Sequence, residues 1–595
     1  MIKNKFIFLA FLLLLVFNVN TNLKAQNYDP KNTEQKINYA MQLFRLAYVD
    51  KVDAPKLVQD AIVQMLKELD PHSVYISKEE LDKMNEPLVG NFDGVGIQFQ
   101  VIKDTIVVVD VISGGPSEKV GIIAGDKIVA IDGKPATGDT INSNFVLSKL
   151  RGKKGTIVNV SIFRRAKNKV LDFTITRDKI PLTSIDAILM ATPEVGYIRL
   201  DRFSRTSMDE FHKALSDLKT QGMKDLILDL RGNGGGFMDI AIDLADEFLT
   251  SDKLIVYTEG LSSPKQSFNS TTKGGFEKGK LVLLIDEGSA SASEIVSGAI
   301  QDWDRGLVVG RRSFGKGLVQ RPFDLPDGSV IRLTTARYHT PSGRCIQKSY
   351  SDGLDDYYGD FAKRYNNGEL SSADKIHFPD SLKYFTNNKR VVYGGGGIMP
   401  DIFIPMDTSK ISDYYVDLRR KNVFNDYIMD YIDKNRESLK IKFPDFKKFQ
   451  SGFILDDVFM DDFAKAAAKA GVKKYNVNPE KLSAMMAQYL QKVKSDTAMF
   501  AKLNKYSDLA AYLSKDNETL NKEMQKYASN EDATSVKALD NSYRYIHYQL
   551  KALLARNLYD TNAYYEVIKD IDDAYLKAVE IIKNDKLFDK LKGKY

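Results

Sequence analysis

The stretch that decides the fold reads Gly288-Ser289-Ala290-Ser291-Ala292-Ser293-Glu294 and directly follows the apolar run Leu281–Ile285. An apolar run, a turn of small residues and then a helical pattern predict a buried strand that passes through a tight turn into a helix. A serine at this turn would lie at a helix N-terminus, where unpaired N–H groups stabilise developing negative charge. On chemistry alone, Ser289, Ser291 and Ser293 are equal candidates for a nucleophile.

A second stretch, Ser313-Phe314-Gly315-Lys316-Gly317-Leu318-Val319-Gln320, follows another apolar strand at residues 307–309. It places one lysine between two glycines. A lysine amine takes a proton from serine only when it is neutral, and desolvation favours the neutral form. Serine paired with lysine is a recognised variant of the serine-hydrolase arrangement. The two stretches together predict a hydrolytic dyad.

At these residues the chain resembles the carboxyl-terminal processing (tail-specific) peptidases, and the resemblance covers about residues 35–405. It implies that the middle serine, Ser291, is the nucleophile. It also implies that Lys316, 25 residues later, is the base, and that Gln320, four residues further on, orients the lysine. The α/β core that carries these residues is expected to be crotonase-like by the same resemblance.

A glycine loop, Asp229-Leu230-Arg231-Gly232-Asn233-Gly234-Gly235-Gly236, lies between a predicted buried strand at residues 225–230 and a predicted helix. The family resemblance implies that the Gly236 N–H forms the oxyanion hole together with the Ala292 N–H. A glycine loop between strand and helix also suits a dinucleotide, but the G-x-G-x-x-G spacing and a Walker lysine are absent. No cofactor is therefore expected.

Residues 88–178 alternate short apolar strands with glycine-rich turns and are similar to a PDZ domain. Such domains bind a peptide C-terminus as an added strand and hold its carboxylate with loop N–H groups. The matching carboxylate loop is Gly94, Val95, Gly96 and Ile97, in which the glycines allow N–H groups to converge on an anion. A plain hairpin with glycine turns is the alternative.

The composition limits the function classes. A chain of 595 residues is too long for one core, and its net charge of +6 is too small to indicate nucleic-acid binding. Cys345 is the only cysteine, so no intramolecular disulfide forms, and we interpret it as a strand residue rather than a nucleophile. The five histidines are scattered without metal-ligand spacing, so no metal site is predicted.

The N-terminus has the order of a secretory signal peptide. Lys3 and Lys5 precede an apolar stretch at residues 6–17, and a polar region ends at Ala25. We therefore predict a signal peptide at residues 1–25 and an exported, periplasmic protein. An uncleaved anchor is the alternative, but the apolar run is short for a bilayer span.

The predicted fold class is a multidomain α+β protein with four parts after the signal peptide. These are an N-terminal helical region, a PDZ unit, a peptidase core with a surface insertion at about 349–392, and a C-terminal helical domain: residues 27–87, 88–178, 180–405 and 410–595. Within the last part, residues 464–470, 482–493 and 543–554 are amphipathic. Its charged faces are expected to be solvated. The alternative is that they bind a membrane surface or a partner, either an adaptor or a second copy.

These features together predict an exported serine endopeptidase that reads substrate C-terminal tails with its PDZ unit and has protein or peptide substrates with apolar C-termini. The alternative is a non-catalytic PDZ scaffold that binds tails without cutting them, and an amidase or esterase on the same core is a third reading. Glu294 is expected to be a structural carboxylate in the first turn of its helix.

Overall fold

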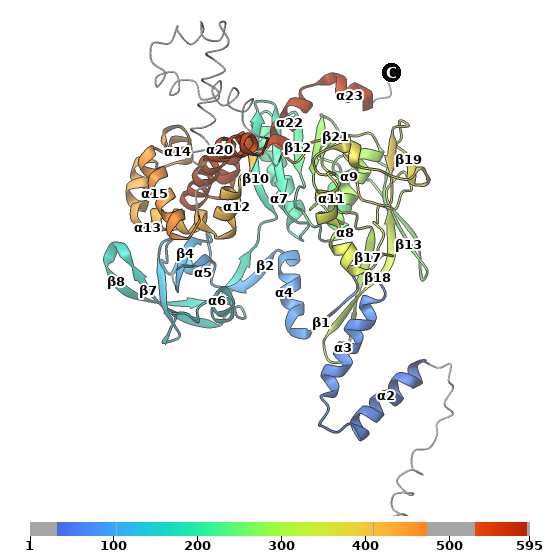
Figure 1. The fold of residues 1–595 in the computed structure, drawn as a ribbon, viewed down its shortest axis with the longest axis horizontal. Helices are drawn as coiled ribbons and strands as arrows, with labels where there is room; N and C mark the ends of the chain where they lie inside the picture. The colour runs from blue at the N-terminus through green and yellow to red at the C-terminus, as the bar shows by residue number, and fades with distance from the viewer. Residues whose placement is uncertain (1–32, 103, 408–409, 473–529, 592–595) are drawn as a thin grey trace, which may run out of the picture. The chain divides into compact units, whose positions relative to one another are not determined.

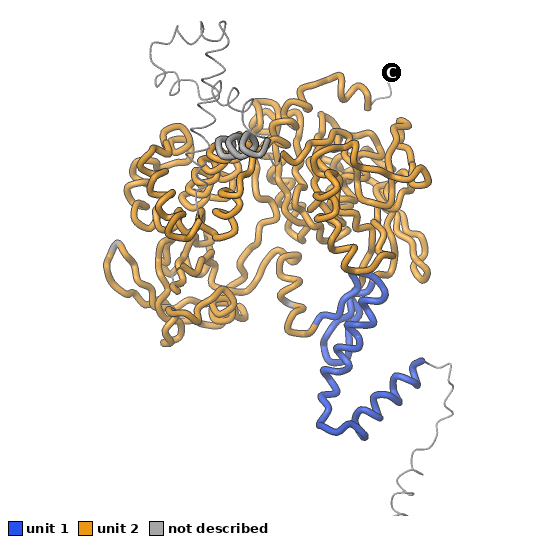
Figure 2. The backbone as a smooth tube through the Cα atoms, viewed as in Figure 1, with its two compact units in different colours: residues 1–76, 322–333 blue, residues 77–321, 334–595 orange. Residues whose placement is uncertain are grey.

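The computed structural model describes residues 33–102, 104–407, 410–472 and 530–591 (Figure 1). The chain divides into two compact units, Met1–Ile76 with Pro322–Leu333 and Ser77–Arg321 with Thr334–Tyr595 (Figure 2). The predicted signal peptide and the amphipathic segment 482–493 lie outside the described residues. Among the helices that are described, none combines the length and the apolar character needed to cross a bilayer.

The first unit contains the N-terminal helices and a small pairing of strands. Its elements are α2 Thr33–Ala47, α3 Ala54–Lys67, β1 Val74–Ile76 and the first part of β18 Val330–His339. Strand β1 runs antiparallel to β18, with Ile76 opposite Val330. Between α3 and β1, the Asp70 carboxylate accepts hydrogen bonds from the N–H groups of His72 (2.8 Å) and Ser73 (2.9 Å). His72 therefore lies in a turn that the Asp70 side chain holds.

The predicted PDZ unit is an antiparallel sheet with two short helices. Its elements are β2 Asn91–Gly94, β3 Ile97–Ile102, β4 Thr105–Val111, α5 Pro116–Lys119, β5 Lys127–Ile131, β6 Lys134–Pro135, α6 Ser143–Leu150, β7 Ile157–Arg164, β8 Lys169–Thr176 and β9 Asp178–Pro181. The sheet order is β3-β4-β5-β7-β8, and β2 pairs separately with β9. Val158, Val160 and Ile162 alternate along β7 and join Val146 and Leu150 of α6 in one apolar core.

The peptidase core is built on a six-stranded sheet. Its strands, in spatial order, are β10 Ile185–Thr192, β11 Val195–Leu200, β12 Asp225–Asp229, β15 Leu281–Ile285, β16 Leu307–Gly310 and β21 Ile402–Phe403. All neighbours are parallel except β10 and β11. Every residue of β15 is buried, which explains its continuous apolar sequence. One face of the sheet is covered by α7 Ser207–Thr220, α8 Met238–Asp246 and α9 Ala292–Asp302 (Figure 1).

The other face of this sheet is covered by helices from near the C-terminus. These are α22 Asp573–Ile582 and α23 Asp585–Leu591, while α21 Thr561–Ile568 lies against β10. Tyr575, Ala578 and Ile582 share an apolar cluster with the strand residues Tyr197 and Leu284. The predicted C-terminal helical domain at 410–595 therefore includes two groups of helices with different packing. The last helices, α22 and α23, pack on the peptidase sheet and so belong to the core.

The remaining C-terminal helices form their own aromatic core and contact the PDZ unit. They are α12 Asp413–Arg420, α13 Val423–Lys442, α14 Phe446–Gly452, α15 Asp457–Lys469 and α20 Asn530–Leu558. On α13, the Asp433 carboxylate pairs with Lys127 (3.1 Å) and Arg165 (3.0 Å) of the PDZ unit. Met429 of the same helix packs on Val107. The helical part thus holds one side of the PDZ sheet.

The insertion after the core strands was predicted to be a surface excursion, and this is wrong for part of it. It contains α10 Leu354–Tyr358, α11 Asp360–Asn366, β19 Lys383–Phe385 and β20 Val391–Tyr393. Tyr357, Arg364 and Glu369 are buried, with at most 5% of each residue exposed. The buried groups pair with the loop after β16, a long-range contact that local sequence does not encode.

Replacement of Tyr575 by alanine tests whether α22 belongs to the core. The ring is 5% exposed and packs edge-on against Tyr197, with ring centroids 5.2 Å apart. Tyr575→Ala should lower the free energy of unfolding by about 3 kcal/mol or more, because it leaves a cavity against the sheet. The matched control is the next residue, Leu576, which is 46% exposed. Leu576→Ala should change stability by about 0.5 kcal/mol or less, and equal losses in denaturant titrations would contradict the packing.

Candidate active site

Ser291 lies at the strained turn between β15 and α9. Its backbone has φ 55° and ψ −111°, an unusual conformation for a residue other than glycine, and it is the N-cap of α9. Such outliers persist where the surrounding structure enforces them, often at functional sites. A Cβ on Gly235 would lie 2.9 Å from the Ser291 Cβ, so only glycine fits against this turn.

The two neighbouring serines are engaged in the structure of the turn. The Ser289 hydroxyl donates to the Leu230 carbonyl oxygen at 2.8 Å, and the Ser293 hydroxyl donates to the Asn233 carbonyl oxygen at 2.8 Å. Both serines are fully buried, whereas Ser291 is only half-buried. The geometry thus distinguishes Ser291 from the other two, which the chemistry of the sequence alone does not.

Lys316 lies in the loop between β16 and β17 Leu318–Asp324. Its Nζ donates a hydrogen bond to Gln320 Oε1 at 3.1 Å. Gln320 is four residues further along the chain, on β17. The predicted lysine and glutamine are therefore in direct contact.

Glu294 connects the serine turn to the lysine loop. Its Oε2 accepts the N–H groups of Ser291 (2.8 Å) and Lys316 (2.9 Å). Its Oε1 accepts the Ser313 hydroxyl (2.5 Å) and the Gly315 N–H (2.7 Å). Burial raises the pKa of this carboxyl, and the four hydrogen bonds oppose that rise. Glu294 has the structural role that the sequence predicts.

A tyrosine that sequence reasoning missed makes a second connection. Tyr338, on β18, is 1% exposed, and its hydroxyl lies 2.5 Å from the Lys316 carbonyl oxygen and 3.0 Å from the Ser291 carbonyl oxygen. A single O–H can therefore donate to the backbone of either segment. Nothing in the local sequence around Tyr338 indicates this role, because both partners are distant in the chain.

The glycine loop after β12 lies against the start of α9. Asn233 is fully buried, and its carbonyl oxygen accepts the Ala290 N–H at 3.0 Å as well as the Ser293 hydroxyl. Gly236, with φ 151°, lies opposite Phe203 in an isolated parallel β-bridge. The hydrogen bonds of this bridge are made by the Gly235 carbonyl oxygen and the Phe237 N–H, so the Gly236 N–H takes no part in them. The Ala292 N–H belongs to the first turn of α9, where N–H groups have no intrahelical acceptor.

A buried ion cluster around Asp229 holds the first residues of this glycine loop. Asp229 is fully buried, and its Oδ2 accepts the Tyr197 hydroxyl (2.6 Å), Arg199 Nη1 (2.9 Å) and Arg231 Nη2 (2.6 Å). Burial alone would raise the pKa of Asp229, but the two arginines hold it well below its usual value. Arg231 also pairs with Asp572 (2.7 Å), the N-cap of α22. An acidic residue that ends a buried strand two residues before an arginine is a signal that could have found this cluster.

In the PDZ unit, Val95 and Gly96 connect β2, which ends at Gly94, to β3, which begins at Ile97. The Val95 carbonyl oxygen accepts the Ser117 N–H at 3.0 Å, and the Gly96 carbonyl oxygen accepts the Ile112 N–H at 3.0 Å. A trans peptide holds its N–H opposite to its C=O, so the N–H groups of Gly96 and Ile97 point away from these donors. Gly96 has φ 76°, which favours glycine.

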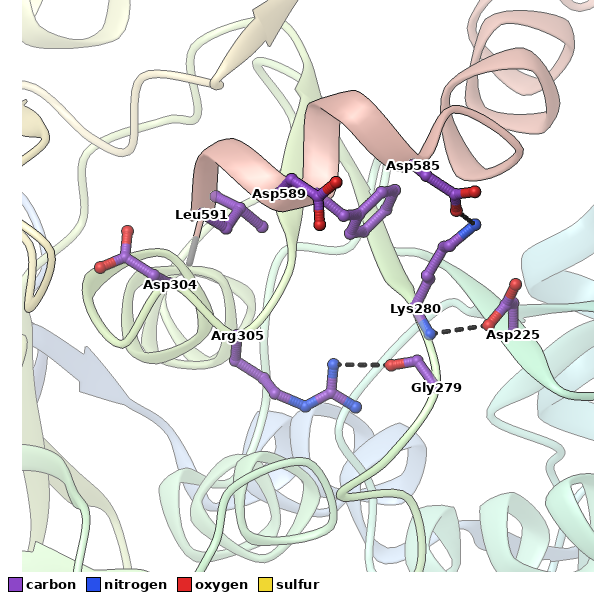
Figure 3. Close-up of a pocket in the computed structure, with 9 residues that line it drawn as sticks. Asp225, Gly279, Lys280, Asp304, Arg305, Asp585, Asp589 and Leu591 are labelled. Atoms are coloured by element: carbon purple, nitrogen blue, oxygen red, sulfur yellow. Dashed lines mark hydrogen bonds and ion pairs between the residues drawn. The ribbon is translucent and has the colours of Figure 1, made fainter. Parts of the chain in front are cut away.

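A cavity of about 570 Å³ lies at the opposite end of the parallel strands (Figure 3). Two of its cationic residues are engaged within the lining: Lys280 Nζ lies 2.5 Å from Asp585 Oδ1, and Arg305 donates to the Gly279 carbonyl oxygen at 3.0 Å. Ligands in α/β sheets bind at the carboxyl ends of the strands, which is the edge that carries Ser291. Within the described part of the chain, no cluster of three or more potential metal ligands is present.

Four protein-family models match the chain. "Peptidase family S41" covers residues 194–355, "PDZ domain" residues 94–176 and "Activating protease CtpB N-terminal domain" residues 16–80. A "family of unknown function (DUF8443)" covers residues 414–492.

Two curated relatives are similar over most of their length. The carboxy-terminal-processing protease of Bartonella bacilliformis is 35% identical over 345 residues, which is 57% of this chain and 77% of that protein. The carboxy-terminal processing protease CtpB of Bacillus subtilis is 36% identical over 360 residues, 60% of this chain and 72% of that protein. Among solved structures, a photosystem II D1 C-terminal processing protease is 26% identical, covers 63% of this chain and 93% of its own, and has a TM-score of 0.32.

The extent of these matches, together with the PDZ unit and the α/β core, establishes that the chain belongs to the carboxy-terminal processing proteases of peptidase family S41 and is a serine-type peptidase with a PDZ domain.

Proposed function

We propose that this chain is an exported endopeptidase that cuts proteins near their C-termini, with Ser291 as nucleophile and Lys316 as general base. The observation that carries the proposal is the double connection between the two segments. Glu294 Oε2 accepts the N–H groups of both residues, and the Tyr338 hydroxyl lies within hydrogen-bonding distance of both carbonyl oxygens. Such a connection fixes two backbone segments relative to each other, which proton transfer between their side chains requires.

In the proposed reaction, neutral Lys316 takes the proton of the Ser291 hydroxyl as that oxygen attacks the scissile carbonyl carbon. The resulting ammonium then gives a proton to the leaving amine, and water later releases the acyl group from Ser291. Gln320 accepts a hydrogen bond from the Lys316 amine and so restricts its direction. The substrate oxyanion would be stabilised by the N–H groups of Gly236 and Ala292, each worth about 3 kcal/mol when preorganised.

Substrate selection is assigned to the PDZ domain. Its loop of Gly94, Val95, Gly96 and Ile97 has two N–H groups turned away from the internal acceptor contacts, which suits capture of a terminal carboxylate. The substrate class is therefore proteins and peptides with apolar C-termini, added as a strand to the PDZ sheet. An adaptor or a second copy that binds the C-terminal helical domain, residues 410–595, would be an additional partner.

Export is proposed from the N-terminal residues 1–25, which have a basic start, an apolar centre and a small residue before the cleavage position.

The alternative function is a non-catalytic PDZ scaffold, which would not need the arrangement of Ser291, Lys316 and Gln320. The scaffold hypothesis predicts that the wild-type chain binds a peptide tail and does not cleave the bound peptide. A single-turnover cleavage assay therefore separates the two functions.

Ser291→Ala should abolish cleavage and leave the fold intact, because the hydroxyl is the attacking group. Ser289→Ala and Ser293→Ala are matched controls in the same turn. Each should keep substantial turnover and lose about 1 kcal/mol of stability, since its hydroxyl makes structural hydrogen bonds. Both hydroxyls donate to a buried carbonyl oxygen, and that of Ser289 also accepts the Asp286 N–H. Peptide cleavage and thermal unfolding measure both effects. The Ser291→Ala chain would also retain bound substrates for identification, and comparable cleavage by it would show that the nucleophile is another residue.

The rate of acylation should rise with pH through the neutral to alkaline range. A lysine amine in water has a pKa of about 10.4, and only its deprotonated form can act as a base. Lys316→Arg should be inactive, because a guanidinium does not lose its proton. Lys316→Ala should be inactive as well, and its loss should not add to that of Ser291→Ala, since the two residues act as one unit. A rate that stays flat between about pH 5 and pH 9 in single-turnover measurements would contradict this assignment of the base.

Tail recognition predicts a preference that peptide chemistry can measure. A substrate with an apolar, free C-terminus should be cut faster than the same substrate with an amidated or an Asp-Asp end. Each charge-assisted hydrogen bond to the carboxylate is worth about 1.5–3 kcal/mol, and a charged side chain would lose its hydration without gaining a partner. Equal kcat/KM values for the three substrates would show that the PDZ domain does not read C-termini.

A further inference from the structure

The loop that carries Lys316 has almost no regular structure. The N–H groups of Ser313 and Phe314 donate to distant backbone carbonyl oxygens, and other backbone groups of the loop bond to side chains. We call residues 312–316 the base loop. Its N–H groups at Gly315 and Lys316 donate to Glu294, as described above. The carbonyl oxygens on the other side of the same loop also need partners, because buried carbonyl groups without hydrogen bonds are costly.

One side chain, Arg364 of α11, supplies donors to three of these carbonyl groups. Arg364 Nη1 donates to the carbonyl oxygens of Ser313 (2.8 Å) and Arg312 (3.2 Å), and Nη2 donates to that of Phe314 (3.3 Å). The Arg364 side chain is only 3% exposed. A guanidinium has five N–H groups in a fixed planar fork, so it can hold several carbonyl groups in one geometry.

Arg364 lies in a cluster of three cations and two carboxylates that pair with one another. Arg364 Nε lies 2.9 Å from Asp360 Oδ2, and the same carboxylate oxygen accepts Lys348 Nζ at 3.0 Å. Glu369 accepts two hydrogen bonds from Arg312 of the base loop, at 2.6 and 2.8 Å. A buried arginine is costly unless its charge is paired. Asp360 supplies that ion pair, and the two Nη atoms donate to the carbonyl groups, although the buried Nε makes no hydrogen bond.

We propose that Arg364 is a positioning residue for Lys316. The inference rests on the proposed role of Lys316 as the base. Glu294 holds the N–H side of the base loop and Arg364 holds its C=O side, so the peptide planes that lead to Lys316 cannot rotate. Arg364 touches neither substrate nor the reacting atoms, and it belongs to the insertion at 349–392, beyond the residues that match the S41 model.

The experiment compares Arg364→Met with a matched control, Arg305→Met. Arg305 also donates to three backbone carbonyl oxygens, those of Phe248 (2.8 Å), Gly279 (3.0 Å) and Phe276 (2.8 Å). It lies at the cavity at the opposite end of the strands (Figure 3). Both substitutions therefore remove similar hydrogen bonds, and only one of them affects the base loop.

For Arg364→Met we expect kcat on a peptide substrate to fall on the order of 10²-fold, with KM unchanged, because the base is misplaced while the binding surfaces stay intact. Arg305→Met should lose comparable thermal stability and keep the wild-type kcat. A third variant, Arg364→Lys, keeps the positive charge but loses the planar fork, so it should share the loss of kcat. If Arg364→Met does not fold, Arg364→Lys against Arg305→Met decides the question.

The proposal is overturned if Arg364→Lys has the wild-type kcat, or if both methionine variants lose the same fraction of kcat at equal folded fraction. Lys316→Ala, measured in parallel, separates this inference from the proposed function. An inactive Lys316→Ala beside a normal Arg364 variant would refute only the positioning role. A Lys316→Ala enzyme that still cleaves would refute the base itself.

Discussion

The buried carboxylate of Glu294 is the constraint on which the candidate site depends. It has two oxygen atoms and accepts four hydrogen bonds, three of them from backbone N–H groups of the segments that carry Ser291 and Lys316. Each segment follows a different parallel strand, and neither has regular secondary structure at the point of contact. A carboxylate so fully engaged tolerates little movement of either segment, because any shift would leave a buried charge without partners.

Two further buried ion clusters hold the segments near Glu294. On one side, Arg364 and its acidic partners hold the carbonyl groups of the loop that leads to Lys316. On the other, Asp229 holds Arg231 in the glycine loop, and Arg231 pairs in turn with Asp572 at the start of α22. Buried polar groups that are satisfied together rigidify a site. The core therefore depends on residues that lie far outside the segment matched by the S41 model.

The sequence predicted the elements that depend on local pattern. The buried strand β15 has the predicted bounds, because a continuous apolar run in a parallel sheet leaves few alternatives. The contact between Lys316 and Gln320 was expected from the family resemblance, and the two side chains are hydrogen-bonded. Tyr338, Arg364 and the packing of α22 were not predicted, because each contact joins residues distant in the chain and no local periodicity encodes it. The same limit explains why part of the insertion was wrongly placed at the surface.

The cover that α22 and α23 provide for the core sheet has a consequence for biosynthesis. The strands that they cover are made first, and residues 573–591 are made hundreds of residues later on the same chain. Until then, one apolar face of the sheet has no intramolecular partner, and exposed apolar surface in an incomplete chain favours chaperone binding or aggregation over the native fold. A nascent or prematurely terminated chain therefore lacks a finished core, so proteolytic competence would arise only once translation has passed these helices.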